Sequence, residues 1–218
     1  MSTQMAALTV FMMEMTSALI SILVGYYASK AYKASSAKGL LFLYLGFIIL
    51  GLGIFLRTIT ATYLVLVNRV TDSLPNSLVG LSNLAGIVFT LTQLVAYSLF
   101  VATYAYQFRG SHPQSLDVGV ISAAAVFPVA RLFYIPALEL VAIVMLGFVA
   151  VSAMINWLHR RTLSSALVFS GFGLMFFSHI LYLFVIFREG LLFFGQLSQL
   201  AGFICLLVML AKVNRANA

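Results

Sequence analysis

The sequence predicts an all-α, polytopic membrane protein: one domain, residues 1–218, built as a bundle of seven transmembrane helices. Two observations carry this prediction. The composition is 63% hydrophobic and 8% charged, whereas a soluble domain usually carries about 25% charged residues. Apolar runs also recur along the chain, and each is long enough to cross ~30 Å of hydrocarbon at a rise of ~1.5 Å per residue. We therefore expect the chain to lie in a lipid bilayer.

Short connections of at most about 11 residues join the predicted spans, as a compact bundle requires. The first span contains Glu14 and stops at Lys30, and the second carries Arg57 within an apolar run. Pro128 is expected to kink the fourth span or shift its start, and Pro136 suits the first turn of the fifth. In chain order the spans are residues 5–29, 39–67, 79–107, 118–134, 136–158, 163–187 and 191–213.

Basic residues fall mainly on one side of this seven-span arrangement. Arg69 and Arg188 lie on the other side. Cytoplasmic loops carry an excess of Lys and Arg, so we expect the N-terminus outside the cell membrane and the C-terminus in the cytoplasm. This placement explains the net charge of +7 without a nucleic-acid partner. The residues on the majority side are Lys30, Lys33, Lys38, Arg109, Arg160, Arg161, Lys212 and Arg215.

A faint internal repeat relates the two ends of the chain. The matched segments are residues 91–94 and 197–200, the Gly-Phe steps at 46–47 and 171–172, and the serine pairs at 35–36 and 164–165. The serine pairs stand at different distances from the Gly-Phe steps, so this alignment requires a gap. It predicts two parallel three-helix repeats, residues 5–107 and 136–213, joined by a linker helix at 117–135. The alternative is chance matching in an apolar chain of low complexity.

Polar side chains within the spans define a candidate ligand site. An arginine near the bilayer centre costs about 2.5–3.5 kcal/mol, so Arg57 requires a partner. Glu14 has the same expected depth, ~13–15 Å below the outer end of its span, and we expect the two side chains to form an ion pair. Further polar groups are expected in the same half of the bundle. The candidate ligand-binding residues are Glu14, Arg57, Gln93, His179, Gln196 and Gln199.

Other interpretations of these residues stay open. The ion pair can be a structural clamp between the first two helices. The surrounding groups can form an interior polar network without a ligand, or a docking surface for an extracytoplasmic partner. Small and polar residues also recur on single helical faces, as at Glu14, Ser17, Ser21 and Gly25, and such stripes are typical of helix packing in lipid.

No catalytic motif is present, and we expect neither enzyme activity nor a cofactor. His-Glu-x-x-His, Gly-x-Ser-x-Gly and P-loop patterns do not occur. His179 is the one histidine within a predicted span, which disfavours a haem held by two histidines. Lys212 lies at the end of the seventh span rather than its middle, which excludes a retinal Schiff base at the usual place. A metal site would require Glu14, Glu139 or methionines to converge on His179, and none is expected.

Two stretches, residues 19–53 and 83–100, resemble small three-helix archaeal membrane proteins with no assigned activity. The shared features are the basic turn Lys30-Ala31-Tyr32-Lys33 and the Gly46-Phe47 step. The resemblance covers about the first half of the chain. It implies a plasma-membrane protein of archaeal type, with a second, diverged three-helix copy after it, and it carries no catalytic residues over.

The sequence favours a non-enzymatic, receptor-like or small-solute transport protein that takes a small ligand from the outer side. The alternative function is a structural subunit of a larger complex, such as a respiratory or surface assembly. In that case a membrane-protein partner is expected, and the outer polar residues are interfacial or structural.

Overall fold

The computed structural model describes residues 3–71, 76–109, 135–188 and 190–216. In this part of the chain the regular elements are all helices, which confirms the all-α prediction, and six are long and apolar enough to cross a membrane. The predicted fourth span, residues 118–134, and the linker helix 117–135 lie outside the described residues. The elements are α1 (Thr3–Ser35), α2 (Lys38–Thr71), α3 (Asn76–Arg109), α5 (Ile135–Arg160), α6 (Leu163–Leu183), the 3-10 turn η1 (Phe184–Ile186) and α7 (Gly190–Ala216).

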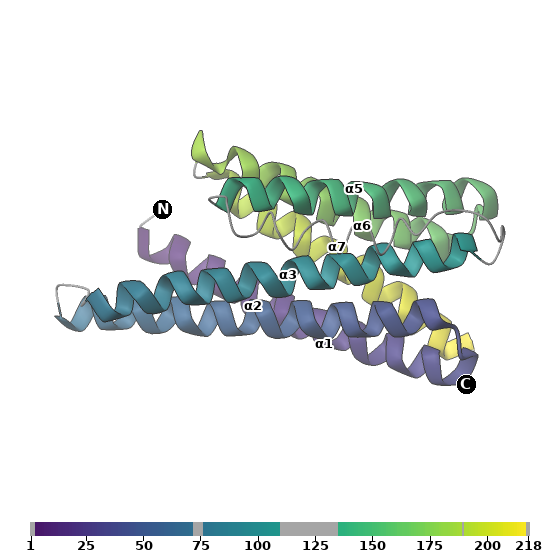
Figure 1. Ribbon diagram of the computed structural model, residues 1–218, viewed down its shortest axis with the longest axis horizontal. Coiled ribbons are helices and arrows are strands. Elements are labelled where there is room, and N and C mark those ends of the chain that lie inside the picture. Colours follow the sequence, from purple (N-terminus) through teal and green to yellow (C-terminus); the bar gives the residue numbers. More distant parts are fainter. Residues whose placement is uncertain (1–2, 72–75, 110–134, 189, 217–218) are drawn as a thin grey trace.

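The helices form two triplets that face each other (Figure 1). In the first triplet α2 packs against both α1 and α3, and in the second α6 packs against both α5 and α7. The triplets join along two seams, where α1 contacts α7 and α3 contacts α5. The α2–α3 hairpin extends beyond the other helices at the end where α1 begins (Figure 1).

The turns that end α1 and α5 have the same backbone geometry. Ser36 has φ 55° and Arg161 has φ 48°, the left-handed conformation that commonly terminates a helix. The Ser36 amide donates to the Tyr32 carbonyl at 2.8 Å, and the Arg161 amide donates to the Trp157 carbonyl at 2.8 Å. Ser36 and Arg161 are 125 positions apart, and so are Tyr32 and Trp157.

This geometry differs from the serine-based alignment. Ser36 corresponds to Arg161 rather than to a serine, and the residues at 164–165 lie in the first turn of α6. The same displacement of 125 positions relates Gly46 to Gly171. These turns and glycines are therefore spaced alike in the first two helices of each triplet, without the gap that the serine pairs require.

Two glycine contacts have a similar arrangement in the two triplets. A Cβ added to Gly46 would lie 2.5 Å from the Phe100 ring on α3, and one added to Gly171 would lie 2.6 Å from the Leu206 side chain on α7. Phe100 and Leu206 are 106 positions apart. At both places a glycine allows the middle helix of a triplet to approach its third helix closely.

An aromatic core fills the space between the triplets. Its members are each no more than 1% exposed: Phe47, Tyr97, Phe100, Phe172 and Phe203. Phe47 lies 4.6 Å from Phe100, 6.4 Å from Phe172 and 6.0 Å from Phe203, measured between ring centroids. These distances suit offset and edge-to-face ring contacts. Because the rings come from α2, α3, α6 and α7, they hold the two triplets together.

Two predicted span ends differ from the structure. The first span was predicted to end at residue 29, but α1 continues to Ser35, where the left-handed Ser36 terminates it. The sixth span was predicted to reach residue 187, but α6 ends at Leu183. Phe184 has φ −88° and ψ 0°, which leaves the α-helical region, and the chain continues as η1.

Candidate functional site

Glu14 on α1 is the centre of the first polar cluster. Its Oε1 accepts hydrogen bonds from Arg57 Nη2 at 2.6 Å and from Gln196 Nε2 at 2.7 Å, and its Oε2 accepts from Thr58 Oγ1 at 2.9 Å. The Glu14 side chain is 15% exposed. The predicted ion pair between α1 and α2 is therefore confirmed, and Gln196 extends it to α7.

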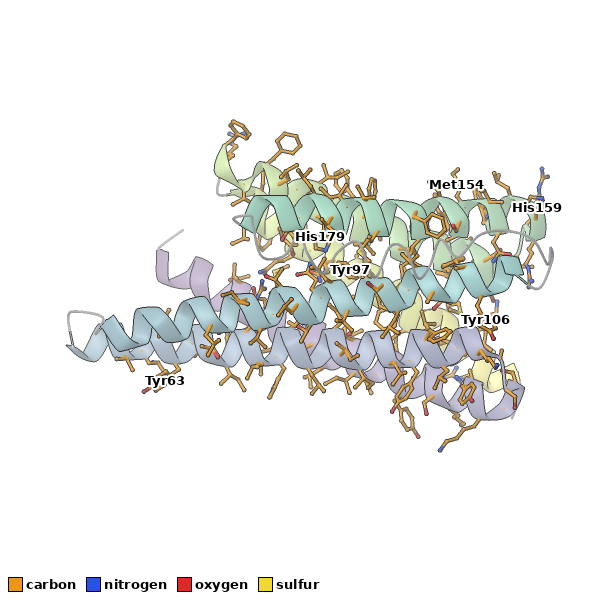
Figure 2. All side chains as sticks on the ribbon, in the orientation of Figure 1. Tyr63, Tyr97, Tyr106, Met154, His159 and His179 are labelled. Carbon is orange, nitrogen blue, oxygen red and sulfur yellow. The ribbon has the colours of Figure 1, made fainter. Side chains whose placement is uncertain are left out.

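His179 on α6 is the centre of the second cluster. Its Nδ1 lies 2.6 Å from Glu139 Oε2 on α5, and its Nε2 lies 2.6 Å from the Tyr97 hydroxyl on α3. Gln93 Nε2 is 3.3 Å from both Tyr97 Oη and His179 Nε2. Figure 2 shows His179 and Tyr97 close together between the triplets, far from His159 at the opposite end.

One form of the His179 ring satisfies all of these contacts. A neutral imidazole with its proton on Nδ1 donates to Glu139, and its Nε2 accepts from Tyr97 and Gln93. With the Gln93 amide nitrogen directed at Nε2, an imidazolium would place two donors face to face. In this orientation of the Gln93 amide, the hydrogen bonds fit a neutral ring.

The two clusters border one cavity of about 200 Å³. It lies between the two triplets and has both polar and apolar walls. All six candidate residues from the sequence line it: Glu14, Arg57, Gln93, His179, Gln196 and Gln199. The structure thus brings the candidate set together, and ligand binding by these residues stays a prediction. The remaining lining residues are Ser17, Ile54, Phe89, Glu139, Tyr182, Val185 and Leu192.

Gln196 lines this cavity and has a buried side-chain oxygen that is unsatisfied. Its residue exposure is 4%, and its Oε1 has no hydrogen-bond partner in the described part of the chain. The amide orientation is fixed because Glu14 accepts the bond at 2.7 Å from the other end of the amide, and an ionised carboxylate can only accept. A buried acceptor without a donor costs about 1–3 kcal/mol.

Two further contacts complete the polar walls. The Tyr182 hydroxyl donates to Gln199 Oε1 at 2.9 Å. The Arg57 guanidinium carbon lies 4.1 Å from the centroid of the Phe89 ring. A ring face at this distance attracts the cation, so the arginine is held by a carboxylate and an aromatic ring together.

The site was expected to lie deep within the membrane spans, and this is so for the helices of the first triplet only. Glu14 and Arg57 lie several turns inside α1 and α2. Glu139, in contrast, is only four residues after the first residue of α5, and His179 is four residues before the last residue of α6. Four residues rise ~6 Å, so the cavity lies about one turn below the end of the second triplet.

The candidate set from the sequence lacks several residues that complete the clusters. Thr58 was missed because a threonine in a helix usually bonds its own backbone, and here it does so with Ile54 as well as with Glu14. Glu139 was placed in the outer half but not in the site. It is the same residue type as Glu14 and lies 125 positions after it. The other missed lining residues are Ser17, Ile54, Phe89, Tyr182, Val185 and Leu192.

Among the described residues, no group of three or more His, Cys, Asp or Glu side chains is arranged to hold a metal ion. The chemistry of the site is therefore that of a carboxylate–guanidinium pair, a second carboxylate with an imidazole, and three glutamine amides. Comparison of the chain with protein-family models, curated proteins and solved structures finds no match. The functional argument accordingly uses the geometry of the cavity.

Proposed function

We propose that this multi-pass membrane protein is non-enzymatic and binds a small polar ligand in the cavity between its triplets, as a receptor-like or small-solute transport protein. The observation that carries the proposal is a cavity lined by Glu14, His179 and Gln196, the last of which has a buried, unsatisfied oxygen. A structural clamp explains the bond between Arg57 and Glu14. It does not explain why polar groups from both triplets surround an open space.

The proposed orientation has the cavity near the outer membrane face and the C-terminus in the cytoplasm. The ends where α1, α5 and α7 finish and α2 and α6 begin carry most of the described basic residues. An excess of positive charge is typical of the cytoplasmic side. α3 and α5 run in the same direction, as their labelled residues show (Figure 2). This supports the proposal that the chain crosses the membrane seven times.

We also propose that the triplets are two copies of a three-helix unit, the architecture that the archaeal resemblance implies. A third pair of contacts supports this. A Cβ at Gly51 would lie 2.8 Å from Ile22, and a Cβ at Gly147 would lie 3.2 Å from Phe176. Residues 22 and 147, and residues 51 and 176, are again 125 positions apart. In the α1–α2 contact the glycine is on α2 and the large side chain is on α1. In the α5–α6 contact the glycine is on the first helix, α5, and the large side chain is on the second, α6.

A panel of small cations, anions and neutral polar solutes tests ligand binding on the purified full-length chain in lipid nanodiscs. We expect at least one solute to raise the melting temperature in a saturable manner, because a ligand that binds only the folded state stabilises it. Leu192→Trp should remove the response by filling the cavity. Leu163→Trp is the matched control, because Leu163 is 63% exposed and lies at the far end of α6.

The outcomes separate the two functions. A response that survives Leu192→Trp would place the ligand elsewhere. No response to any solute, together with co-purification of one fixed membrane-protein partner, would support the structural subunit instead.

A further inference from the structure

Glu14 and Glu139 occupy corresponding positions in the two triplets. They are 125 positions apart, which is the displacement that relates the two turns and the packing glycines. The residue that corresponds in this way to Arg57 is Tyr182. Each half of the cavity thus contains one carboxylate, but the position that holds a guanidinium beside Glu14 holds a neutral phenol in the second half.

Contacts with the third helix of each triplet support this correspondence. Arg57 packs over the ring of Phe89 on α3. Tyr182 packs over Gly195 on α7, where an added Cβ would lie 2.5 Å from the ring. Phe89 and Gly195 are 106 positions apart, the displacement that relates Phe100 to Leu206. Arg57 and Tyr182 therefore fill the same place in their triplets.

The charges of the two halves differ as a result. The Glu14 carboxylate is balanced by Arg57. The Glu139 carboxylate is bonded to His179, whose contacts favour a neutral ring. With both carboxylates ionised, the described lining residues carry two negative charges and one positive charge. One negative charge is left without a cation, and a charge of this kind is costly in a low-dielectric site unless a counter-charge binds.

The second half also supplies a hydrogen-bond acceptor without a donor, the buried Oε1 of Gln196. A ligand that matches both features carries one positive charge and several N–H donors. The apolar walls at Ile54, Val185 and Leu192 suit a short hydrocarbon tail. The volume suits a molecule of this size, since an engineered cavity of about 150 Å³ accepts benzene.

We propose that the cavity binds a small primary ammonium, whose charge takes the place beside Glu139 that the guanidinium of Arg57 holds beside Glu14. This inference rests on the proposed function and specifies its ligand class. The ammonium group donates to the Glu139 carboxylate and to Gln196 Oε1, and the alkyl part contacts the apolar walls.

The test measures the melting temperature of the full-length chain in nanodiscs at constant ionic strength with n-propylammonium chloride, sodium chloride, sodium propionate or 1-propanol. We expect a saturable increase with n-propylammonium alone. Tyr182→Arg should weaken its apparent affinity by about tenfold or more, because the new guanidinium neutralises Glu139. Leu163→Arg is the matched control, because it adds the same charge at the exposed far end of α6, and it should retain the response.

Glu139→Gln provides an independent variant if Tyr182→Arg fails to fold, because its amide oxygen can still accept from His179. It should also lose the n-propylammonium response, whereas Lys38→Gln at the opposite end should keep it. Stabilisation by propionate, or equal stabilisation by sodium, would overturn the ammonium assignment and leave a ligand-binding cavity in place. A full n-propylammonium response in Tyr182→Arg would also overturn it. Failure of the entire solute panel would overturn the proposed function itself.

Discussion

Gln196 shows, at the scale of a single residue, how this cavity differs from a completed core contact. Its amide nitrogen takes part in the hydrogen bonding of Glu14, while its amide oxygen has no partner in the described residues. The loss of about 1–3 kcal/mol at such an oxygen is a reason for the site to gain stability from a donor. The other two candidate glutamines have bonded side chains: Gln93 donates to Tyr97, and Gln199 accepts from Tyr182.

A prediction for single residues compares His179 with His159, which both lie in described helices. His179→Ala removes the partner of Glu139 and Tyr97, and we expect it to lower the free energy of unfolding by about 2–4 kcal/mol, since buried polar groups lose their bonds. His159→Ala is the matched control. His159 is exposed and bonds only the Ile155 carbonyl, so its effect should stay within about 0.5 kcal/mol. Denaturant unfolding in mixed micelles measures both, and equal losses would contradict the assigned role of His179.

Sequence reasoning identified the charged and amide residues of the site because such groups are costly in hydrocarbon. It could not identify Phe89 or Tyr182, since aromatic residues are common in every span and their role depends on which helices meet. The bond between Tyr97 and His179 likewise requires the contact of α3 with α6 across the bundle. Cross-helix partners of this kind depend on helix rotation, which one sequence does not specify.

At the scale of the elements, close approach of neighbouring helices depends on glycines at particular contacts. Gly46 faces the Phe100 ring, which is fully buried and cannot move aside. Gly86 on α3 has no neighbour among the described residues within 4 Å of an added Cβ. The same residue type is therefore required for packing at one position and is free to change at the other.

This contrast gives an element-scale prediction. Gly46→Ala should lower the free energy of unfolding by about 1–3 kcal/mol, because overpacking forces α2 away from α3. Gly86→Ala should be neutral or slightly stabilising, because alanine favours the helix and meets no obstacle. Thermal unfolding of both variants measures the difference. A tolerated Gly46→Ala would show that the α2–α3 contact is looser than described.

Element boundaries were predicted from apolar length and basic residues, and the helices extend past several of them. The first helix passes Lys30 because a lysine side chain can extend along a helix toward water without ending it. Its end instead depends on the backbone of Ser36, in a left-handed conformation that is uncommon for residues other than glycine. Composition alone could not locate that turn.

At the scale of the whole molecule, the two triplets depend on each other through the seams and the aromatic core. α1 contacts α7, α3 contacts α5, and Phe47 contacts Phe172. Phe47 and Phe172 are 125 positions apart, so a contact between the triplets joins two residues with the spacing of the proposed repeat. The sequence predicted a three-helix repeat from weak matches, and this repeat stays a prediction.

A whole-molecule prediction follows for separated triplets. Residues 1–109 and 110–218, co-expressed as two chains, should assemble, and affinity capture of the first should recover the second. Phe172→Ala should reduce this recovery because its ring is buried between the triplets. Phe177→Ala on the same helix is the matched control, since its ring is 49% exposed. Separate recovery of two stable fragments would show that the triplets do not require each other.

The aromatic core has a consequence for movement of a solute. Tyr97 contacts His179 at the cavity wall, and Phe100 and Phe172 follow on the side toward the basic helix ends. These closely packed rings close the cavity on that side in this conformation. A transporter would have to separate these rings to release its solute on the other side of the membrane. A receptor could bind its ligand and signal without separating them.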